Sequence, residues 1–560
     1  MTVFIDSDGF HIQPLSEREP GKRVLPYKES KRAELKELLF NVIRHKAGKQ
    51  AESQEKQALL EKFCAKATID YLTSYLIFNN DTGHDVGTIC IEWSFLSLSF
   101  LSDYSNYYSS MYENLEKKCI RIHFFDRVYW SEEEFCSLLK GQDDLIRDKY
   151  LGYVVFKPLD NSIVGASVLR PYGDKPNRYF NAVRTYKVDL LGYQFRFDSL
   201  AFQEQDNAVS VCATTALWMT FSKTSKLFRT ELPSPYDITM AAGIRKDIGR
   251  MMPNDGLDLN QIIRSIHSLG LDAEVRGGNS LVWVAGREGE LKVMATERLR
   301  RIIYAYLRCR IPILFGYFLT DSFDSHMVTV TGYRLEPIVR DEQSKKMRLV
   351  ADSIIKLYAH DDQLGPFSKI ELDDEAEIPL KVKVLFENDF SAFGTEMVIP
   401  IKKSIRIKFE EIEAHVGCIH SFFVDVFSLL PEPKEVKWDI YLTRTRDYKV
   451  SIWDEEMGPM ADDKKKLEIV SGSYPFYIWV AKMILNGGEV LHLVFDSTTI
   501  RDNLMIYQVF FVSPTFHQWV QEQGIFPEEG RMKARFLRYT EANYSDWKLF
   551  RKASSGSTGS

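Results

Sequence analysis

Three reactive side chains stand at the ends of largely apolar segments, and their order along the chain limits the folds that this sequence can adopt. Cys212 precedes an apolar stretch with helical spacing, His326 opens a stretch of alternating residues, and Asp361 follows the next extended stretch. The sequence therefore predicts a helix that begins at the cysteine and two strands that carry the histidine and the aspartate. A thiol, an imidazole and a carboxylate in separate segments can act as a nucleophile, its base and the group that orients the base.

The residues around Cys212 favour an ionised thiol. They form an apolar stretch in which Ala213, Ala216, Leu217 and Thr220 recur at helical steps. A thiol at the N-terminus of a helix and beside an imidazolium is stabilised as the thiolate, which is the form that attacks carbonyl carbon. The backbone N–H of Cys212 has no partner within such a helix, so it is available to bind an oxyanion.

The segments that carry His326 and Asp361 are expected to meet at one edge of a sheet. Residues from His326 to Leu335 alternate between two faces, and Ile354–Ala359 reads as the next strand. The connecting loop permits an antiparallel pair, in which the start of one strand lies beside the end of the other. This geometry favours Asp361 over Asp352 as the partner of His326, because Asp352 would lie near the far end.

A glutamine upstream of the cysteine is a candidate second donor to an oxyanion. Gln205 precedes Cys212 by seven residues (212 − 205 = 7), and its side-chain amide can donate a hydrogen bond beside the cysteine N–H. The neighbouring residues Gln203 and Asp206 are alternative candidates for this role.

Together these residues resemble the papain-like cysteine peptidase clan. They are most similar to bacterial members of the kind found in bacteriocin-processing transporters, which cleave double-glycine leaders. The shared pattern is a Gln, a short gap, a Cys that opens a helix, a His-x-Val-x-Val-x-Gly-Tyr strand, and an Asp after the following strand. The stretches 256–270 and 309–314 also resemble the family's second helix and its entry to the histidine strand. The resemblance covers roughly residues 200 to 370.

The resemblance implies a role for each matching residue. Cys212 would be the nucleophile, His326 the base, Asp361 the orienting carboxylate and Gln205 the oxyanion donor. Two positions depart from the family pattern, since Ala213 stands where Gly is usual and Asp362 stands where Pro often follows the aspartate. Neither departure removes a catalytic atom.

The expected fold class is α+β, with a papain-like core flanked on both sides. The core would consist of a helix that carries the cysteine and an antiparallel sheet that carries the histidine and aspartate. We expect an N-terminal α+β domain over 1–195, the peptidase domain over 196–372 and a C-terminal α+β domain over 373–552. Residues 553–560, which are rich in Ser and Gly, read as a flexible tail.

Periodicity and end signals predict further elements. Asp258 is a suitable N-cap and Gly270 a suitable stop for a helix between them. The other predicted helices are Lys31–Arg44, Glu52–Phe78, Thr296–Arg308 and Phe409–Leu429. The predicted strands are Leu151–Leu159, Ile163–Arg170, Pro312–Phe318, Ile378–Leu385, Lys437–Leu442 and Glu489–Phe495, and Arg184–Phe197 also reads as extended.

Composition excludes several other classes of function. The formal net charge is −6, so nothing indicates a nucleic acid or acidic membrane partner. The seven cysteines are scattered, which fits a reducing cytoplasm, and no segment is long and apolar enough for a membrane helix. Neither Cys119 with His123 nor Cys418 with His420 shows the doubled spacing of a zinc site, so we expect no metal and no cofactor.

These observations predict a cytoplasmic cysteine peptidase that hydrolyses a peptide or protein through a thioester and is regulated by its flanking domains. A regulatory protein partner is a further expectation. Two alternatives remain open from the sequence. One is a catalytically inactive papain-like scaffold for protein–protein interaction, and the other is an acyl transferase with transglutaminase-like chemistry.

Overall fold

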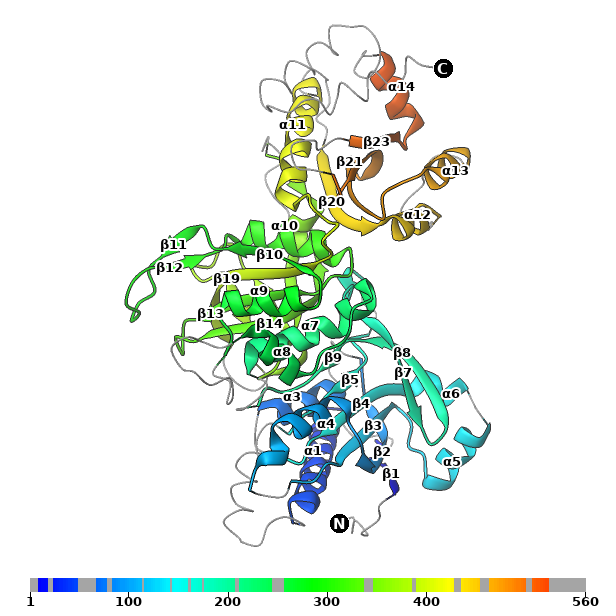
Figure 1. Cartoon of the computed structure of the whole chain (residues 1–560). Coiled ribbons are helices and arrows are strands. Elements are labelled where there is room, and N and C mark those ends of the chain that lie inside the picture. The colour runs from blue at the N-terminus through cyan, green and yellow to red at the C-terminus, as the bar shows by residue number, and fades with distance from the viewer. Residues whose placement is uncertain are drawn as a thin grey trace. The chain divides into compact units, whose positions relative to one another are not determined.

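The computed structural model describes residues 9–18, 24–48, 67–77, 83–112, 115–141, 144–159, 163–173, 176–206, 211–243, 256–336, 346–384, 389–427, 435–453, 463–499 and 506–522. Helices and strands alternate along these residues, which confirms the predicted α+β class (Figure 1). They form two compact units. The first comprises residues 1–294, 312–334 and 356–400, and the second comprises 295–311, 335–355 and 401–560. The first unit takes residues from all three predicted domain ranges, whose boundaries stay a prediction.

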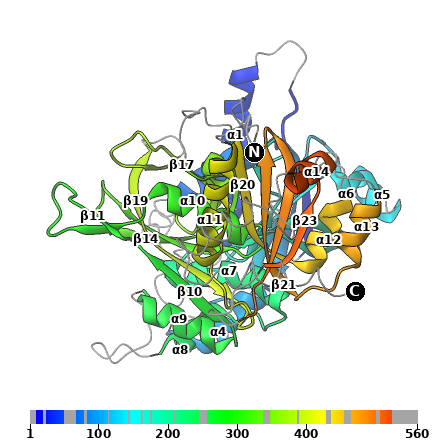
Figure 2. The same cartoon turned by 90° about the horizontal axis from the view of Figure 1, so that it is seen from above.

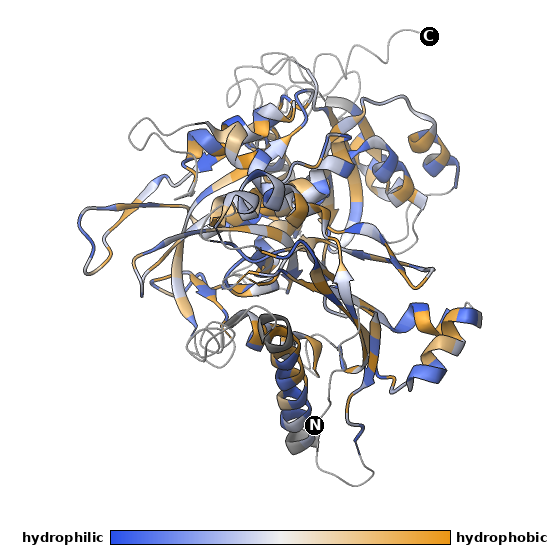
Figure 3. Ribbon diagram, turned by 60° about the horizontal axis from the view of Figure 1, so that its bottom comes forward, coloured by the Kyte–Doolittle hydropathy of each residue, from blue (hydrophilic) through white to orange (hydrophobic). Residues whose placement is uncertain are grey.

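The N-terminal part of the first unit is built on a six-stranded sheet in the order β1-β2-β3-β4-β5-β9. The strands are β1 (Phe10–Pro14), β2 (Val86–Phe95), β3 (Cys119–Asp126), β4 (Tyr150–Phe156), β5 (Ser167–Leu169) and β9 (Ala201–Phe202). The helices are α1 (Val24–Gly48), α3 (Ala67–Leu76), α4 (Leu98–Asn106), α5 (Glu132–Gly141) and α6 (Asp144–Lys149), with a 3₁₀ turn, η1, at Tyr108–Ser110. In α1, hydrophobic and hydrophilic residues alternate along the helix (Figure 3), and its buried face includes Leu35, Leu38, Leu39 and Val42.

The extended conformation predicted over Arg184–Phe197 is confirmed, and the structure divides it into the two strands of a hairpin. β7 (Arg184–Leu190) pairs antiparallel with β8 (Tyr193–Ser199). The turn residues Leu191 and Gly192 both have positive φ, 50° and 82°. Such two-residue turns match the twist of the flanking strands, but a leucine at the first turn position gives no sequence signal for one.

A second sheet in the first unit closes on itself. Six strands run in the order β19-β13-β14-β16-β17-β18, and β18 pairs with β19 again to complete the ring. Their bounds are β13 (Ile313–Leu319), β14 (Ser325–Leu335), β16 (Ile354–Asp361), β17 (Gly365–Leu372), β18 (Leu380–Val382) and β19 (Phe390–Ile401). β10 (Asp272–Gly277) continues the sheet beyond β19, β6 (Arg178–Tyr179) pairs with β14, and β11 (Ser280–Val282) pairs with β12 (Leu291–Val293).

Three helices accompany this sheet in the first unit: α7 (Cys212–Phe228), α8 (Pro235–Ala242) and α9 (Leu259–Ser268) (Figure 1). The caps of α9 are those that the sequence predicts. The Asp258 side chain accepts a hydrogen bond from the N–H of Gln261 at 2.9 Å, the Gln261 side chain accepts one from the N–H of Asp258, and Gly270 has φ 74°. Because each of these end signals depends only on neighbouring residues, the sequence was sufficient to predict where the helix begins and ends.

The second unit contains a five-stranded sheet in the order β15-β20-β21-β22-β23. The strands are β15 (Arg348–Leu349), β20 (Val436–Arg444), β21 (Tyr477–Leu485), β22 (Gly488–Asp496) and β23 (Ile506–Phe511). The helices are α10 (Thr296–Leu307), α11 (Phe409–Phe427), α12 (Thr445–Trp453), α13 (Asp463–Ser471) and α14 (Pro514–Glu522), with a 3₁₀ turn, η2, at Val350–Ser353. Figure 2 shows α12 and α13 together beside this sheet.

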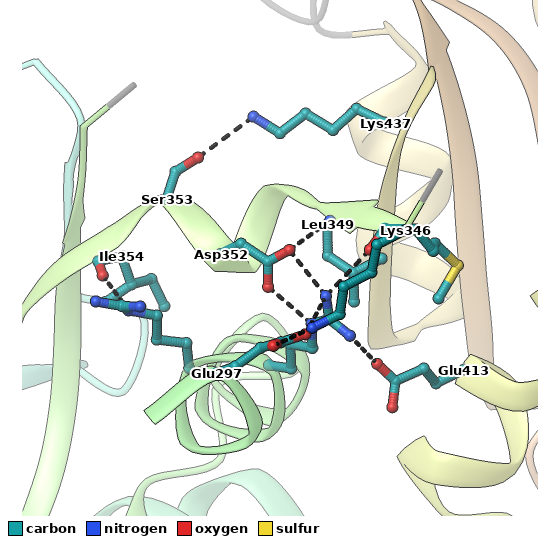
Figure 4. Close-up of polar contacts among 11 residues, drawn as sticks. Glu297, Lys346, Leu349, Asp352, Ser353, Ile354, Glu413 and Lys437 are labelled. Atoms are coloured by element: carbon teal, nitrogen blue, oxygen red, sulfur yellow. Dashed lines mark hydrogen bonds and ion pairs between the residues drawn. The ribbon is translucent and has the colours of Figure 1, made fainter. Parts of the chain in front are cut away.

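Arg301 joins three segments of the second unit through its guanidinium group, and Figure 4 labels its partners Glu297, Asp352 and Glu413. Its Nε and Nη2 donate to the two carboxylate oxygens of Asp352 in η2 at 2.7 and 2.9 Å, and its Nη1 donates to Glu413 of α11 at 2.7 Å. Glu297, one turn earlier in α10, lies 2.7 Å from Nη2. A planar guanidinium suits this bidentate geometry, so one side chain holds α10, η2 and α11 together.

Most predicted elements agree with the structure to within a few residues. The main exceptions are the strands predicted over Ile163–Arg170 and Ile378–Leu385, which shorten to β5 and β18. The first part of the helix predicted over Glu52–Phe78 lies outside the described residues. Among the helices that the structure describes, none combines the length and apolar character needed to cross a membrane.

Candidate active site

Cys212 is the first residue of α7. The preceding residue, Val211, has extended backbone angles, and its carbonyl accepts the first helical hydrogen bond from Thr215 at 2.9 Å. The N–H of Cys212 therefore lies among the donors that have no partner within the helix. The Cys212 thiol is free and half-buried. The predicted helix start at the cysteine is confirmed.

Two threonine contacts fix α7 against the strand that carries His326. The Thr329 hydroxyl on β14 donates to the carbonyl of Ala216 at 2.8 Å and lies 3.2 Å from the hydroxyl of Thr220. These buried polar contacts hold the cysteine helix in one position on the sheet, because sliding the helix along β14 would leave the hydroxyls unpaired.

His326 and Asp361 meet at one edge of the sheet, as the strand-pair argument predicts. β14 and β16 are neighbours, and the contacts between them run in opposite directions: His326 lies beside Asp361, and the Thr331 hydroxyl donates to the carbonyl of Tyr358 at 3.1 Å. The two strands are therefore antiparallel. The imidazole Nε2 lies 3.1 Å from Asp361 Oδ1, and both side chains are buried.

Asp361 accepts hydrogen bonds from several directions. The Tyr317 hydroxyl donates to Oδ2 at 3.0 Å, and the backbone N–H groups of Gln363 and Leu364 donate to Oδ1 at 3.0 and 3.2 Å. Burial by itself raises the pKa of Asp361, but the charge and hydrogen bond of His326, with these donors, lower it below the usual value. The carboxylate is therefore ionised and fixed in orientation at neutral pH.

The His326 imidazole is held in its charged form. Burial lowers its pKa, but the carboxylates of Asp361 and Asp362 and a side-chain hydrogen bond with Cys212 raise it well above the ordinary value. Because Nε2 faces the two carboxylates, Nδ1 is the ring nitrogen left for the thiol. The imidazole thus connects the Cys212 thiol on α7 with Asp361 on β16.

Asp362 adds a second carboxylate to the histidine. Its Oδ1 lies 3.4 Å from His326 Nε2, and the side chain is fully buried. Burial, together with the negative charges of Asp361 and Glu204, raises the pKa of Asp362 to about 7 despite the opposing effect of His326. His360, two residues earlier in the chain, is not part of the site: its ring nitrogens bond the carbonyl of Leu200 and the N–H of Phe367, both at 3.1 Å.

The structure places Gln205 in the short segment between β9 and α7, with its side chain half-buried. Residues 207–210, which complete the connection to Cys212, lie outside the described part of the chain. Gln203 and Asp206 are both buried, and the Asp206 carboxylate lies 3.9 Å from Lys157 Nζ. A carboxylate in an ion pair has no proton to donate, which leaves the glutamines as the candidate oxyanion donors, and the role of Gln205 stays a prediction.

Sequence reasoning missed Tyr317 as a residue of the site. Tyr317 on β13 pairs directly with His326 on β14, and its hydroxyl orients Asp361. The sequence predicts the two strands, 312–318 and 326–335, that pair here. Which residues lie opposite each other depends on the loop between the strands, so the pairing of Tyr317 with His326 was not predicted.

His326, Asp361 and Asp362 also offer ligand atoms that all lie within 4.8 Å of one another. The hydrogen-bond donors on Asp361 and the proton on His326 account for this arrangement without an ion. A cavity of about 600 Å³ lies elsewhere, in the second unit; it is lined by residues of α12, α13 and the segment before β21 and contains none of the candidate catalytic residues.

No model of a known protein family matches this chain, and no curated protein matches it.

Proposed function

We propose that this protein is a papain-like cysteine peptidase that hydrolyses a peptide or protein substrate through a thioester intermediate. The observation that carries the proposal is the contact between three side chains. A thiol lies at a helix N-terminus, a charged imidazole contacts it, and an ionised carboxylate lies on the far side of the imidazole ring. The chain order of Cys, His and Asp and the packing of the cysteine helix on an antiparallel sheet support a papain-like core.

Each residue has a distinct task in the proposed reaction. The Cys212 thiolate attacks the carbonyl carbon of the scissile peptide bond, and the His326 imidazolium gives its proton to the leaving amine nitrogen. A thioester remains on Cys212. His326, now neutral, removes a proton from water, whose oxygen attacks the thioester carbon and releases the carboxylic acid. Asp361 keeps the ring oriented in both steps.

The oxyanion formed in each step requires hydrogen-bond donors. The N–H of Cys212, which has no partner within the helix, supplies one, and the side-chain amide of Gln205 is the proposed second donor. A preorganised donor is most effective at the helix N-terminus, where the helix dipole also favours negative charge.

The reactivity of the cysteine gives a direct test of the proposal. Cys212 should react with iodoacetamide faster than Cys136 and Cys418, which are also half-buried and outside any disulfide. Burial raises the pKa of the Cys418 thiol, so that this residue is a suitable slow reference. Mass spectrometry of peptides after timed labelling measures the three rates. Equal rates for Cys212 and Cys418 would show that the thiol is not activated and would remove the basis for the peptidase.

Replacing Gln205 with alanine should lower the turnover of p-nitrophenyl acetate, a probe that acylates reactive thiols whatever the natural substrate. The expected loss is on the order of 10²- to 10³-fold, which is typical for one oxyanion donor. Gln203→Ala is the matched comparison, because Gln203 is the competing glutamine. A large loss in Gln203→Ala with an unchanged rate in Gln205→Ala would transfer the role to Gln203.

The two alternative functions give different results. A catalytically inactive scaffold would leave p-nitrophenyl acetate turnover at the level of the Cys212→Ala variant. An acyl transferase would convert the acyl group to an amide when a primary amine is added, whereas a peptidase would release mainly the free acid.

A further inference from the structure

The carboxyl group of Asp362 has no task in the reaction above, although it lies within the site. We propose that Asp362 is a positioning residue that keeps His326 protonated by placing a second, otherwise uncompensated carboxylate against the imidazole. This inference rests on the proposed function and adds to it, because a stable imidazolium is the acid that the leaving amine requires. The position is also one at which the chain departs from the pattern of the family it resembles.

The first argument is the contrast between the two neighbouring carboxylates. Asp361 has the Tyr317 hydroxyl and two backbone N–H groups in addition to the imidazole. Among the described residues, no other residue donates a hydrogen bond to either carboxylate oxygen of Asp362, and only its own backbone N–H helps to stabilise the charge. Both side chains are buried. The negative charge on Asp361 is thus shared among several donors, whereas that on Asp362 is not.

The second argument concerns the cost of a buried charge. A carboxylate without donors in a protein interior is strongly destabilised unless a cation lies close to it. For Asp362 that cation is the imidazolium of His326, whose Nε2 is 3.4 Å from Oδ1. Ionised Asp362 and protonated His326 therefore stabilise each other, and the two groups titrate as a pair.

The charges around this pair come from four segments of the chain. His326 on β14 is the only one among them that opposes the negative charge of Asp362, while Asp361 at the end of β16 and Glu204 after β9 add to the negative charge. The groups that face the imidazole are Cys212 on α7, Asp361, Asp362, and Tyr317 on β13, whose ring packs edge-on against it. Glu204 accepts hydrogen bonds from the Thr68 hydroxyl and the Val164 N–H.

The consequence for pH dependence follows from the sign of the interaction. Because the pKa of Asp362 is about 7, the carboxyl group is ionised on the alkaline side, where a histidine would normally lose its proton. The added negative charge then favours the imidazolium. The site therefore retains its general acid at a pH at which a histidine with one carboxylate partner would be neutral.

The test is the titration of His326 in the full chain with Cys212→Ala, so that it does not depend on catalysis. The ring Cε1–H signal of His326 is followed by NMR against pH in protein with ¹³C-labelled histidine, and His326→Gln assigns it. Adding Asp362→Asn should lower the midpoint of the His326 titration by about 1 to 3 pH units, which is the effect of losing one adjacent opposite charge. Asp362→Leu, which removes the charge and the polar group together, should do the same. Asp144→Asn, an exposed carboxylate in α6, should leave the titration unchanged.

An unchanged His326 titration in folded Asp362→Asn and Asp362→Leu proteins would overturn the proposal. The matching activity readout is the alkaline limb of p-nitrophenyl acetate turnover, which should move to lower pH in Asp362→Asn with Cys212 present. If the wild-type protein shows no turnover but its His326 titration responds to Asp362→Asn, the peptidase function fails and the role of Asp362 stands. If the wild-type protein does turn over p-nitrophenyl acetate but its His326 titration does not respond to Asp362→Asn, the peptidase function stands and the role of Asp362 fails.

Discussion

Replacing Cys212 with alanine should lower peptide hydrolysis by a factor on the order of 10⁴ or more, because no other group at the helix start can form the thioester. The measurement compares the peptides released from a denatured proteome by the wild-type and Cys212→Ala proteins, with new N-termini labelled and identified by mass spectrometry. The wild-type protein should produce a set of cleavages that the variant does not.

The control for this experiment is Cys418→Ala. Cys418 is also half-buried and outside any disulfide, and it lies in α11 of the second unit. Its replacement should leave the cleavage pattern intact, and circular dichroism should show that both variants are folded. Identical cleavages from the wild-type and Cys212→Ala proteins would assign any activity to another residue or to a contaminant.

Replacing Arg301 with alanine should destabilise the second unit by at most about 3 to 5 kcal/mol, the cost of removing one member of a fully buried ion pair, because Arg301 is buried but its carboxylate partners are partly exposed. The carboxylates of Asp352 and Glu413 would lose the cation that they share. Burial raises the pKa of Glu413, and Arg301 opposes that change, so the variant should also bind an extra proton at this glutamate more readily. Urea unfolding followed by tryptophan fluorescence measures the loss, since Trp438 and Trp479 are buried in this unit.

Arg298 provides the matched control on the same helix. Its guanidinium lies 3.5 Å from Glu410, and both side chains are about one-third exposed. Arg298→Ala should change the free energy of unfolding by less than about 1 kcal/mol, as is usual for surface pairs. Arg301→Lys should fall between the two, because a lysine cannot form the bidentate contact with Asp352. Equal destabilisation by Arg298→Ala and Arg301→Ala would contradict the role given to the Arg301 contacts.

Local signals account for the parts of the fold that sequence could predict. The caps of α9 at Asp258 and Gly270, and the start of α7 at Cys212, depend on residues within one helical turn. The β7–β8 turn at Leu191 and the pairing of β18 with β19 do not. A leucine is a poor turn signal, and the pairing that closes the ring joins strands whose contact depends on tertiary packing.

The candidate site divides in the same way. The order and spacing of Cys212, His326 and Asp361 were readable because each residue marks the end of a periodic segment. The contribution of Tyr317 depends on which β13 residue lies opposite His326. The contribution of Asp362 depends on the burial of its carboxylate without a donor from any other described residue, which only the folded chain reveals.

The division of the chain into two units has a practical consequence for dissecting the protein. The backbone passes from one unit to the other near residues 294, 311, 334, 355 and 400. Deleting everything after residue 400 would not yield the first unit alone, because α10 and η2 would stay behind without Glu413 of α11 as a partner for Arg301. For the same reason, one proteolytic cut cannot release either unit. The chain crosses between the two units several times, so an exchange of one unit between proteins would have to transplant all three of its segments together.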